Sequence, residues 1–230
     1  MKRKYSRLKK TIITLLALLI IFTGYVEIIN RNSKRMTYRQ KVLKIVYPLS
    51  MFWANLKGKN NLSLSSNNAE APVSFYTLKD TIINGKEFDL ASLKGKKILL
   101  VNTASDCGYT NQYTGLEKLY RQYNAKLIVL GFPSNDFKQQ EKESNVSIAQ
   151  FCKENFDVSF PLMQKNSVLK QPGQNKVFEW LTDPAKNGWN SQAPTWNFCK
   201  YLVDENGRLV NYWGSAVAPF DTKIIEALDK

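Results

Sequence analysis

Two short apolar runs, separated by an amphipathic segment, set the strongest limit on how this chain can fold. Residues 98–103 and 127–132 are short and rich in Ile, Leu and Val, which is typical of strands that are buried on both faces. Between them, apolar side chains recur at helical spacing: Tyr113, Leu116, Leu119, Tyr120 and Tyr123. A strand, a helix and a second buried strand in this order predict an α/β domain with parallel strands.

Other segments extend this α/β pattern. Residues 73–78 alternate like a strand, and Asn84-Gly85 is a tight-turn signal before a further short run at 86–90. Helices are predicted over 146–156, 177–181 and 220–229, and strands over 198–203 and 209–213 around a turn at 204–207. Together these elements predict a central mixed sheet flanked by helices.

Basic residues are concentrated at the N-terminal end. Residues 1–71 hold 14 of the 33 Lys and Arg residues but only two acids, Glu27 and Glu70. The remaining residues hold 19 basic and 17 acidic side chains, so they contribute only +2 to the net charge of +14. Nucleic-acid binding usually needs a basic face on the folded domain, so we expect no nucleic-acid partner.

The first 29 residues have the pattern of a membrane anchor. A basic flank at 1–10 precedes an apolar segment at 11–29, which as a helix would span about 28 Å, roughly one bilayer core. A cleaved signal peptide is the alternative, but residues 23–27 form a poor cleavage site, so an uncleaved, single-pass anchor is favoured. Each flank carries six Lys and Arg residues, so the positive-inside rule does not fix the orientation. The usual behaviour of N-terminal anchors favours a domain on the extracytoplasmic (periplasmic) side.

Residues 30–57 form a basic, amphipathic segment, with helix-like spacing up to Pro48. Phe52 and Trp53 suit a membrane interface. Packing against the domain or a neighbouring protein is the alternative. Residues 58–71 are rich in Asn and Ser, which predicts a flexible linker before a single domain at 72–230.

The three cysteines define the possible chemistry. The chain has no histidine, and no two of its cysteines lie close enough for a CxxC motif or a zinc pair, so no metal or cofactor is expected. Cys107 follows the strand at 98–103 and precedes a helix, a position that stabilises a thiolate through free N–H groups and the helix dipole. From this local argument alone, a reactive and a buried, inert cysteine remain equally open.

Three longer blocks resemble the glutathione peroxidase family. Residues 101–120, VNTASDCGYTNQYTGLEKLY, resemble its signature V-N-x-A-S-x-C-G-x-T-x-Q-Y-x-x-L-x-x-L-Y. Residues 128–141, IVLGFPSNDFKQQE, resemble L-G-F-P-C-N-Q-F-x-x-Q-E, and residues 195–203, TWNFCKYLV, resemble W-N-F-x-K-F-L-V. The blocks occur in the family's order, and the resemblance covers residues 72–230. It implies a thioredoxin-like fold and reduction of hydrogen peroxide and of organic or lipid hydroperoxides.

By this resemblance, Cys107 corresponds to the peroxidatic residue and Gln140, Trp196 and Asn197 to the rest of the catalytic tetrad. The thiolate would attack a peroxide oxygen and become a sulfenic acid, with these polar donors stabilising the charges. Lys142-Glu143 stand where the family usually has Pro-Gly, which changes the expected shape of the loop that carries Gln140 but not the identity of that residue.

Cys152 is similar in position to the resolving cysteine of thioredoxin-reduced family members. This implies a Cys107–Cys152 disulfide that thioredoxin reduces. Glutathione is a less favoured reductant, because no arginine cluster lies near the site. Cys199 matches no functional position and is expected to be a core residue. The stretch between Met163 and Trp196 lacks room for the insertion of tetrameric relatives, which favours a monomer.

Two other functions use the same cysteine. One is a thiol–disulfide oxidoreductase, although residues 107–110 lack the second cysteine of a CxxC motif. The other is a membrane-bound redox sensor that passes the oxidation of Cys107 to a partner without peroxidase turnover.

Overall fold

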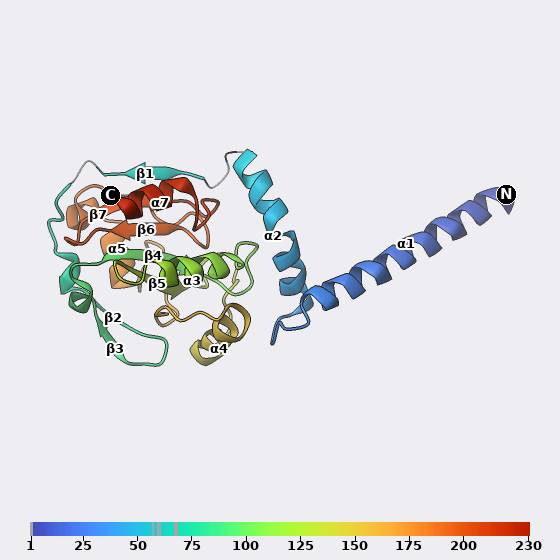
Figure 1. Cartoon of the computed structure of the whole chain (residues 1–230), viewed down its shortest axis with the longest axis horizontal. Coiled ribbons are helices and arrows are strands. Elements are labelled where there is room, and N and C mark those ends of the chain that lie inside the picture. Colours follow the sequence, from blue (N-terminus) through green and yellow to red (C-terminus); the bar gives the residue numbers. More distant parts are fainter. Residues whose placement is uncertain (1, 57, 59–60, 67–68) are drawn as a thin grey trace.

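The computed structural model describes residues 2–56, 58, 61–66 and 69–230. The folded domain is organised around β4 (Lys97–Thr103), whose residues are all buried. β5 (Leu127–Pro133) pairs with β4 in parallel, and β6 (Lys200–Val203) pairs with its other edge in the antiparallel sense. β7 (Leu209–Trp213) and β1 (Ser63–Ser65) complete a sheet of order β1-β7-β6-β4-β5 (Figure 1). The expected mixed sheet is confirmed.

Alternating side chains of β4 face two hydrophobic layers. Leu99 and Val101 pack in a cluster with α3 (Gln112–Gln122), α4 (Asn145–Phe156) and α7 (Thr222–Asp229). Ile98 and Leu100 pack in a second cluster, which holds α5 (Lys176–Leu181) and two 3-10 turns, η1 (Phe75–Thr77) and η2 (Leu90–Leu93). The short α6 (Pro184–Asn187) follows α5. Because both faces of β4 and β5 are buried, their sequences do not alternate between apolar and polar residues.

The prediction of a strand over residues 73–78 is wrong. Thr77 and Leu78 donate their backbone N–H groups to the carbonyls of Ser74 and Phe75, which forms the 3-10 turn η1. Phe75 is fully buried against Trp180, with ring centroids 5.1 Å apart, and the Trp180 indole N–H donates to the carbonyl of Val73 at 2.7 Å. These contacts fix the segment without a neighbouring strand. The hairpin around Asn84-Gly85 instead joins β2 (Lys79–Thr81) to β3 (Glu87–Asp89).

The flexible linker predicted for residues 58–71 is also wrong in part. Ser63–Ser65 form β1, which pairs with β7 at the edge of the sheet. The backbone groups of this edge are thereby used, so the sheet includes chain that precedes residue 72. Residues 59–60 and 67–68 of the predicted linker lie outside the described residues.

Two helices precede the domain. α1 (Lys2–Ile29) projects away from it, and α2 (Tyr38–Leu56) lies against it (Figure 1). Residues 7–29 of α1 are long and apolar enough to cross a membrane, although a signal sequence has the same character. α2 continues through Pro48 to Leu56, further than the helical spacing predicted.

A glycine at the end of α6 provides a test of the packing. Gly188 has φ of 95°, and a Cβ atom there would lie 2.2 Å from the carbonyl oxygen of Glu70. We expect Gly188→Ala to lower the free energy of unfolding by about 3 kcal/mol, because positive φ and a backbone clash both add cost. Gly173→Ala is the matched control, since Gly173 also has positive φ (81°) but open space around it. In denaturant unfolding, Gly173→Ala should lower the free energy of unfolding by only about 1 kcal/mol. Equal losses in the two variants would contradict the packing argument.

Candidate functional site

Cys107 lies in the turn between β4 and α3, at the carboxyl end of the buried strand. Thr110 fixes this turn: its hydroxyl donates to the carbonyl of Ala104 at 2.8 Å and accepts from the N–H of Cys107 at 3.0 Å. The N–H of Tyr109 points at the Cys107 sulfur, 3.4 Å away. The sulfur is therefore held by backbone groups at the start of a helix, where a thiolate is stabilised. The residue is only 1% exposed.

A second loop brings Trp196 and Asn197 to the same place. Asn102, buried on β4, donates to the carbonyl of Trp196 at 2.9 Å and accepts from the N–H of Cys199 at 2.9 Å. Its own carbonyl accepts from the N–H of Phe198, which has φ of 68°. Asn102 thus shapes the turn that presents Trp196 and Asn197. Sequence reasoning missed this role, although an asparagine within a buried apolar strand was the available signal.

Gln140 joins the site from a third segment. Its side-chain oxygen accepts a hydrogen bond from the Asn197 amide at 2.9 Å, and its backbone carbonyl accepts from the N–H of Asp106 at 3.0 Å. Lys138 and Gln139 just before it both have φ near 50°, at 50° and 52°. This tight, irregular turn is the form that the loop takes without the Pro-Gly pair.

Burial and polar contacts act in opposite directions on the thiol. Burial raises the pKa of Cys107 above its ordinary value, and this is the largest effect. The Tyr109 N–H, the side chains of Asn197 and Trp196, and the positive charge of Arg39 all lower that pKa. Three of the four residues expected from the sequence therefore meet at the sulfur, and Gln140 reaches it through Asn197. Cys152 lies in the same hydrophobic cluster as Cys107 but is not among the groups that shift the pKa of Cys107.

Comparison with known proteins agrees with this geometry. The sequence profile for glutathione peroxidase matches residues 75–182. The chain is 42% identical over 146 residues to glutathione peroxidase-like peroxiredoxin GPX5 of Chlamydomonas reinhardtii, which covers 63% of this chain and 89% of the relative. It is 39% identical over 160 residues to glutathione peroxidase-like peroxiredoxin 2 of Saccharomyces cerevisiae, covering 68% and 98%. The chain belongs to the glutathione peroxidase family.

A solved structure extends this result to the fold. The crystal structure of Trgpx in apo form aligns with a TM-score of 0.52 at 34% identity, covering 69% of this chain and 97% of that chain. The thioredoxin-like fold implied by the resemblance is confirmed. The chain is a peroxidase, an oxidoreductase that reduces hydroperoxides, as its family membership predicted.

In this glutathione peroxidase, α2 covers the cysteine. Gln40 donates to the carbonyl of Ser105 at 3.1 Å, and Arg39 donates to the carbonyl of Asp106 at 2.9 Å while its guanidinium pairs with the carboxylate of Asp106. A pocket between α2 and the domain is lined by residues from both sides, among them Met36, Leu43, Cys107, Gly108 and Phe151. The closure of Cys107 therefore depends on the N-terminal segment, which motif spacing within the domain gave no reason to expect.

The Arg39–Asp106 pair should control access to the sulfur. We expect Arg39→Asp to speed the alkylation of Cys107 about threefold at high pH, where the thiol is ionised in every variant, because repulsion from Asp106 lifts the first turn of α2. The double variant Arg39→Asp/Asp106→Arg restores opposite charges and should return the slow rate. Mass spectrometry of the Cys107 peptide measures this rate. If the double variant stayed as fast as the single one, the pair would not hold α2 in place.

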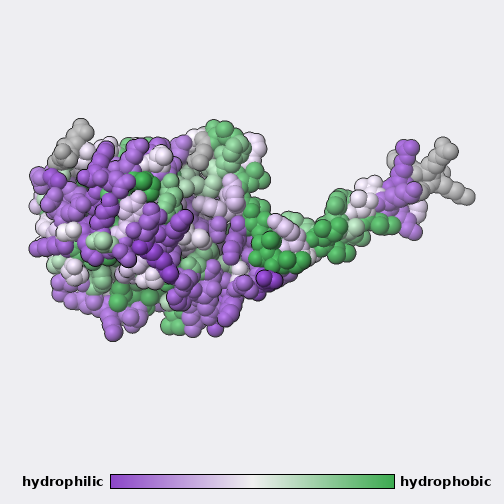
Figure 2. Space-filling model, viewed as in Figure 1, coloured by the Kyte–Doolittle hydropathy of each residue, from purple (hydrophilic) through white to green (hydrophobic). Residues whose placement is uncertain are grey.

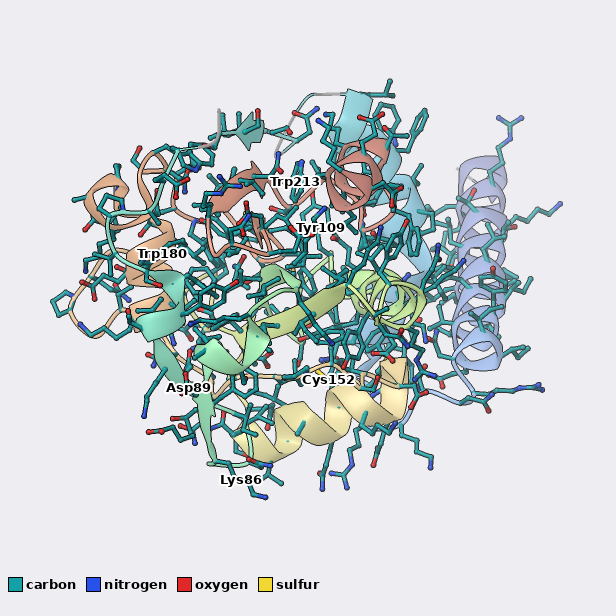
Figure 3. All side chains as sticks on the ribbon, turned by 60° about the vertical axis from the view of Figure 1, so that its left-hand side comes forward. Lys86, Asp89, Tyr109, Cys152, Trp180 and Trp213 are labelled. Atoms are coloured by element: carbon teal, nitrogen blue, oxygen red, sulfur yellow. The ribbon has the colours of Figure 1, made fainter. Side chains whose placement is uncertain are left out.

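The other two cysteines are fully buried and are not among the residues that line this pocket. Cys152 lies on α4, which runs along the lower side of the domain in Figure 3, and burial raises the pKa of its thiol to about 12. The Tyr113 hydroxyl opposes this rise. Cys199 lies near the hydroxyls of Tyr212, at 3.4 Å, and Ser215, at 3.8 Å. Among the described residues, all three cysteines are free thiols.

Glu141 is an unexpected buried acid beside the site. One of its carboxylate oxygens accepts from the Ser105 hydroxyl at 3.0 Å, while the other is buried without a hydrogen-bond partner. Burial raises the pKa of Glu141 from 4.5 to about 8, and the contact with Ser105 opposes the rise. The carboxyl is therefore protonated in the folded protein at neutral pH.

This shift predicts a pH-dependent stability. Between the ordinary pKa and the raised one, the folded state binds a proton that the unfolded state has lost, so stability falls as pH rises. We expect the free energy of unfolding to fall by roughly 3 kcal/mol from about pH 5 to about pH 8 through Glu141. Glu141→Gln keeps the shape and removes the titration, so its denaturant curves should vary less over this range. An equally steep fall in the variant would show that Glu141 is not its source.

Proposed function

We propose that Cys107 is the peroxidatic residue of this enzyme and that Gln140, Trp196 and Asn197 are its catalytic partners. The observation that carries the proposal is the convergence of three separate segments on one sulfur. Trp196 and Asn197 lie against Cys107 and favour its thiolate, and the Gln140 side chain orients the Asn197 amide. Preorganised donors of this kind stabilise a charge that moves from sulfur to oxygen.

The first step transfers one oxygen atom. The Cys107 thiolate attacks the outer oxygen of a hydroperoxide, the O–O bond breaks, and an S–O bond forms to give a sulfenic acid. The leaving alkoxide or hydroxide takes a proton and departs as alcohol or water. The peroxide is reduced by two electrons, and the sulfur is oxidised by two electrons. The amide and indole N–H groups of the partners can donate hydrogen bonds to the leaving oxygen.

We propose that Cys152 resolves the sulfenic acid. Its thiolate would attack the Cys107 sulfur, form a disulfide and displace hydroxide, which takes a proton and leaves as water. A dithiol protein such as thioredoxin then reduces the disulfide to two thiols and is itself oxidised to a disulfide. Burial of Cys152 in α4 opposes its ionisation, so α4 has to open locally before this step. The name peroxiredoxin, carried by relatives at 39% and 42% identity, supports a protein reductant over glutathione.

We also propose that α1 anchors a monomeric enzyme to a membrane as a single-pass span, with the domain on the extracytoplasmic side. The support for the anchor is the 23-residue span at Arg7–Ile29, whose most apolar 18-residue window is only 6% buried in the protein. An enzyme tethered in this way meets lipid hydroperoxides as well as hydrogen peroxide.

Cysteine variants test the catalytic cycle. Cys107→Ser should abolish peroxide consumption, a loss of more than about 1,000-fold, because the nucleophile is absent. Cys152→Ser should complete one turnover with peroxide and then stop under thioredoxin and its reductase, because the sulfenic acid is not resolved. Cys199→Ser is the matched control and should keep the wild-type rate. Steady-state turnover in Cys107→Ser would overturn the assignment of the nucleophile, and full turnover in Cys152→Ser would overturn that of the resolving residue.

A further inference from the structure

α2 has two faces with different surroundings. The face toward the domain is buried or half-buried and includes Gln40, Leu43, Lys44, Tyr47 and Met51. On the opposite face, large apolar side chains recur every three or four residues and are 37% to 63% exposed: Val46, Leu49, Phe52, Trp53 and Leu56. This spacing places them in one continuous stripe, here called the outer stripe. Soluble surfaces rarely keep an apolar patch of this kind without a function.

The first turns of α2, which precede the outer stripe, are held against the end of α1. Asn30 donates its side-chain amide to the carbonyl of Val26 at 2.9 Å and to that of Lys41 at 3.4 Å. Lys41 forms an ion pair of 2.6 Å with Glu27 across the same corner. These contacts tie the first turns of α2 to the last turn of α1. A bilayer crossed by α1 would therefore lie directly beside α2.

The direction of the two helices suits one particular arrangement. α2 runs across the direction of α1 (Figure 1), and hydrophobic atoms line the side of α2 that faces α1 (Figure 2). If α1 crosses the bilayer, α2 lies along the bilayer surface with the outer stripe turned toward the lipid. Trp53 and Phe52, whose rings meet edge-on at 6.0 Å, are side chains that prefer this depth.

We propose that a lipid bilayer surface occupies the outer stripe, so that α2 is a membrane-surface helix held between the peroxidase domain and the lipid. This inference rests on the proposed anchoring of α1. The exposed basic residues Arg31 and Lys34 at the corner suit anionic headgroups.

This arrangement has a consequence for the peroxidase site. The domain-facing side of α2 closes the pocket over Cys107, and the outer stripe is the other side of the same helix. A helix with its side chains is about 10 Å across, so the pocket would lie roughly that distance from the lipid headgroups. Hydroperoxides formed in the membrane would then reach the enzyme at the edge of α2.

Trp53 provides a direct probe, because the other four of the five tryptophans lie in the domain. The full chain is reconstituted into vesicles of phosphatidylcholine and phosphatidylglycerol, in which some acyl chains carry bromine near the headgroup. We expect bromine to quench about half of the Trp53 emission, as for a side chain at interfacial depth. The difference between wild type and Trp53→Phe isolates that emission. Trp189→Phe is the matched control and should leave the quenched component unchanged.

Flotation of the same vesicles separates the two proposals. If the protein does not float with the vesicles, the anchoring is wrong and the docking of α2 fails with it. If the protein floats but Trp53→Phe is quenched as much as wild type, the anchoring stands and the docking of α2 is overturned. If Trp53 of the wild type is unquenched and the Trp53→Cys variant forms disulfide cross-links between two copies, a second copy of this chain occupies the outer stripe. That result also overturns the proposal.

Discussion

The site depends on a single buried side chain, that of Asn102. It stands on β4, the strand that leads to Cys107, and its amide binds the carbonyl of Trp196 and the N–H of Cys199. A buried amide that lost these partners would cost about 1–3 kcal/mol, so the bonds fix the loop as well as satisfy the strand. The sheet and the loop of Trp196 and Asn197 therefore form one rigid unit. The Asn102 amide joins two segments that lie about 90 residues apart in sequence. It thereby keeps the Cys107 sulfur in place relative to the donors of Trp196 and Asn197.

The same site balances reactivity against burial. Dry surroundings strengthen each contact that favours the thiolate, because hydrogen bonds and charges act more strongly at low dielectric. They also make the thiolate itself costly, and this cost is the largest effect on the pKa of Cys107. α2 contributes part of the burial that raises the pKa of Cys107, while the charge of Arg39 on the same helix lowers that pKa. The cysteine is thus held by its hydrogen-bond donors in a buried state, to which α2 contributes.

The sequence allowed the central part of the fold to be predicted, because β4, α3 and β5 follow from local patterns that tertiary contacts do not oppose. The long motifs placed Cys107, Gln140, Trp196 and Asn197 together, and the structure brings them to one region. The failures have physical causes. Residues 73–78 alternate like a strand, yet tertiary contacts, above all the burial of Phe75 against Trp180, decide their form. β1 forms because a sheet edge is available to it. The roles of Asn102, Glu141 and Arg39 rest on contacts between distant segments, which neither spacing nor composition reveals.

A short path joins α1, the proposed membrane anchor, to the turn that carries Cys107. Only residues 30–37 separate the end of α1 from the start of α2, and contacts of Asn30 and Lys41 hold this corner. Near the start of α2, Arg39 and Gln40 donate hydrogen bonds to the backbone carbonyls of Asp106 and Ser105, directly before the cysteine. Any force that changes the angle between α1 and α2 therefore acts on the turn that carries the sulfur. The helix that covers Cys107 is thus continuous with the proposed anchor, so α2 would link the position of the enzyme on a membrane to access to the cysteine.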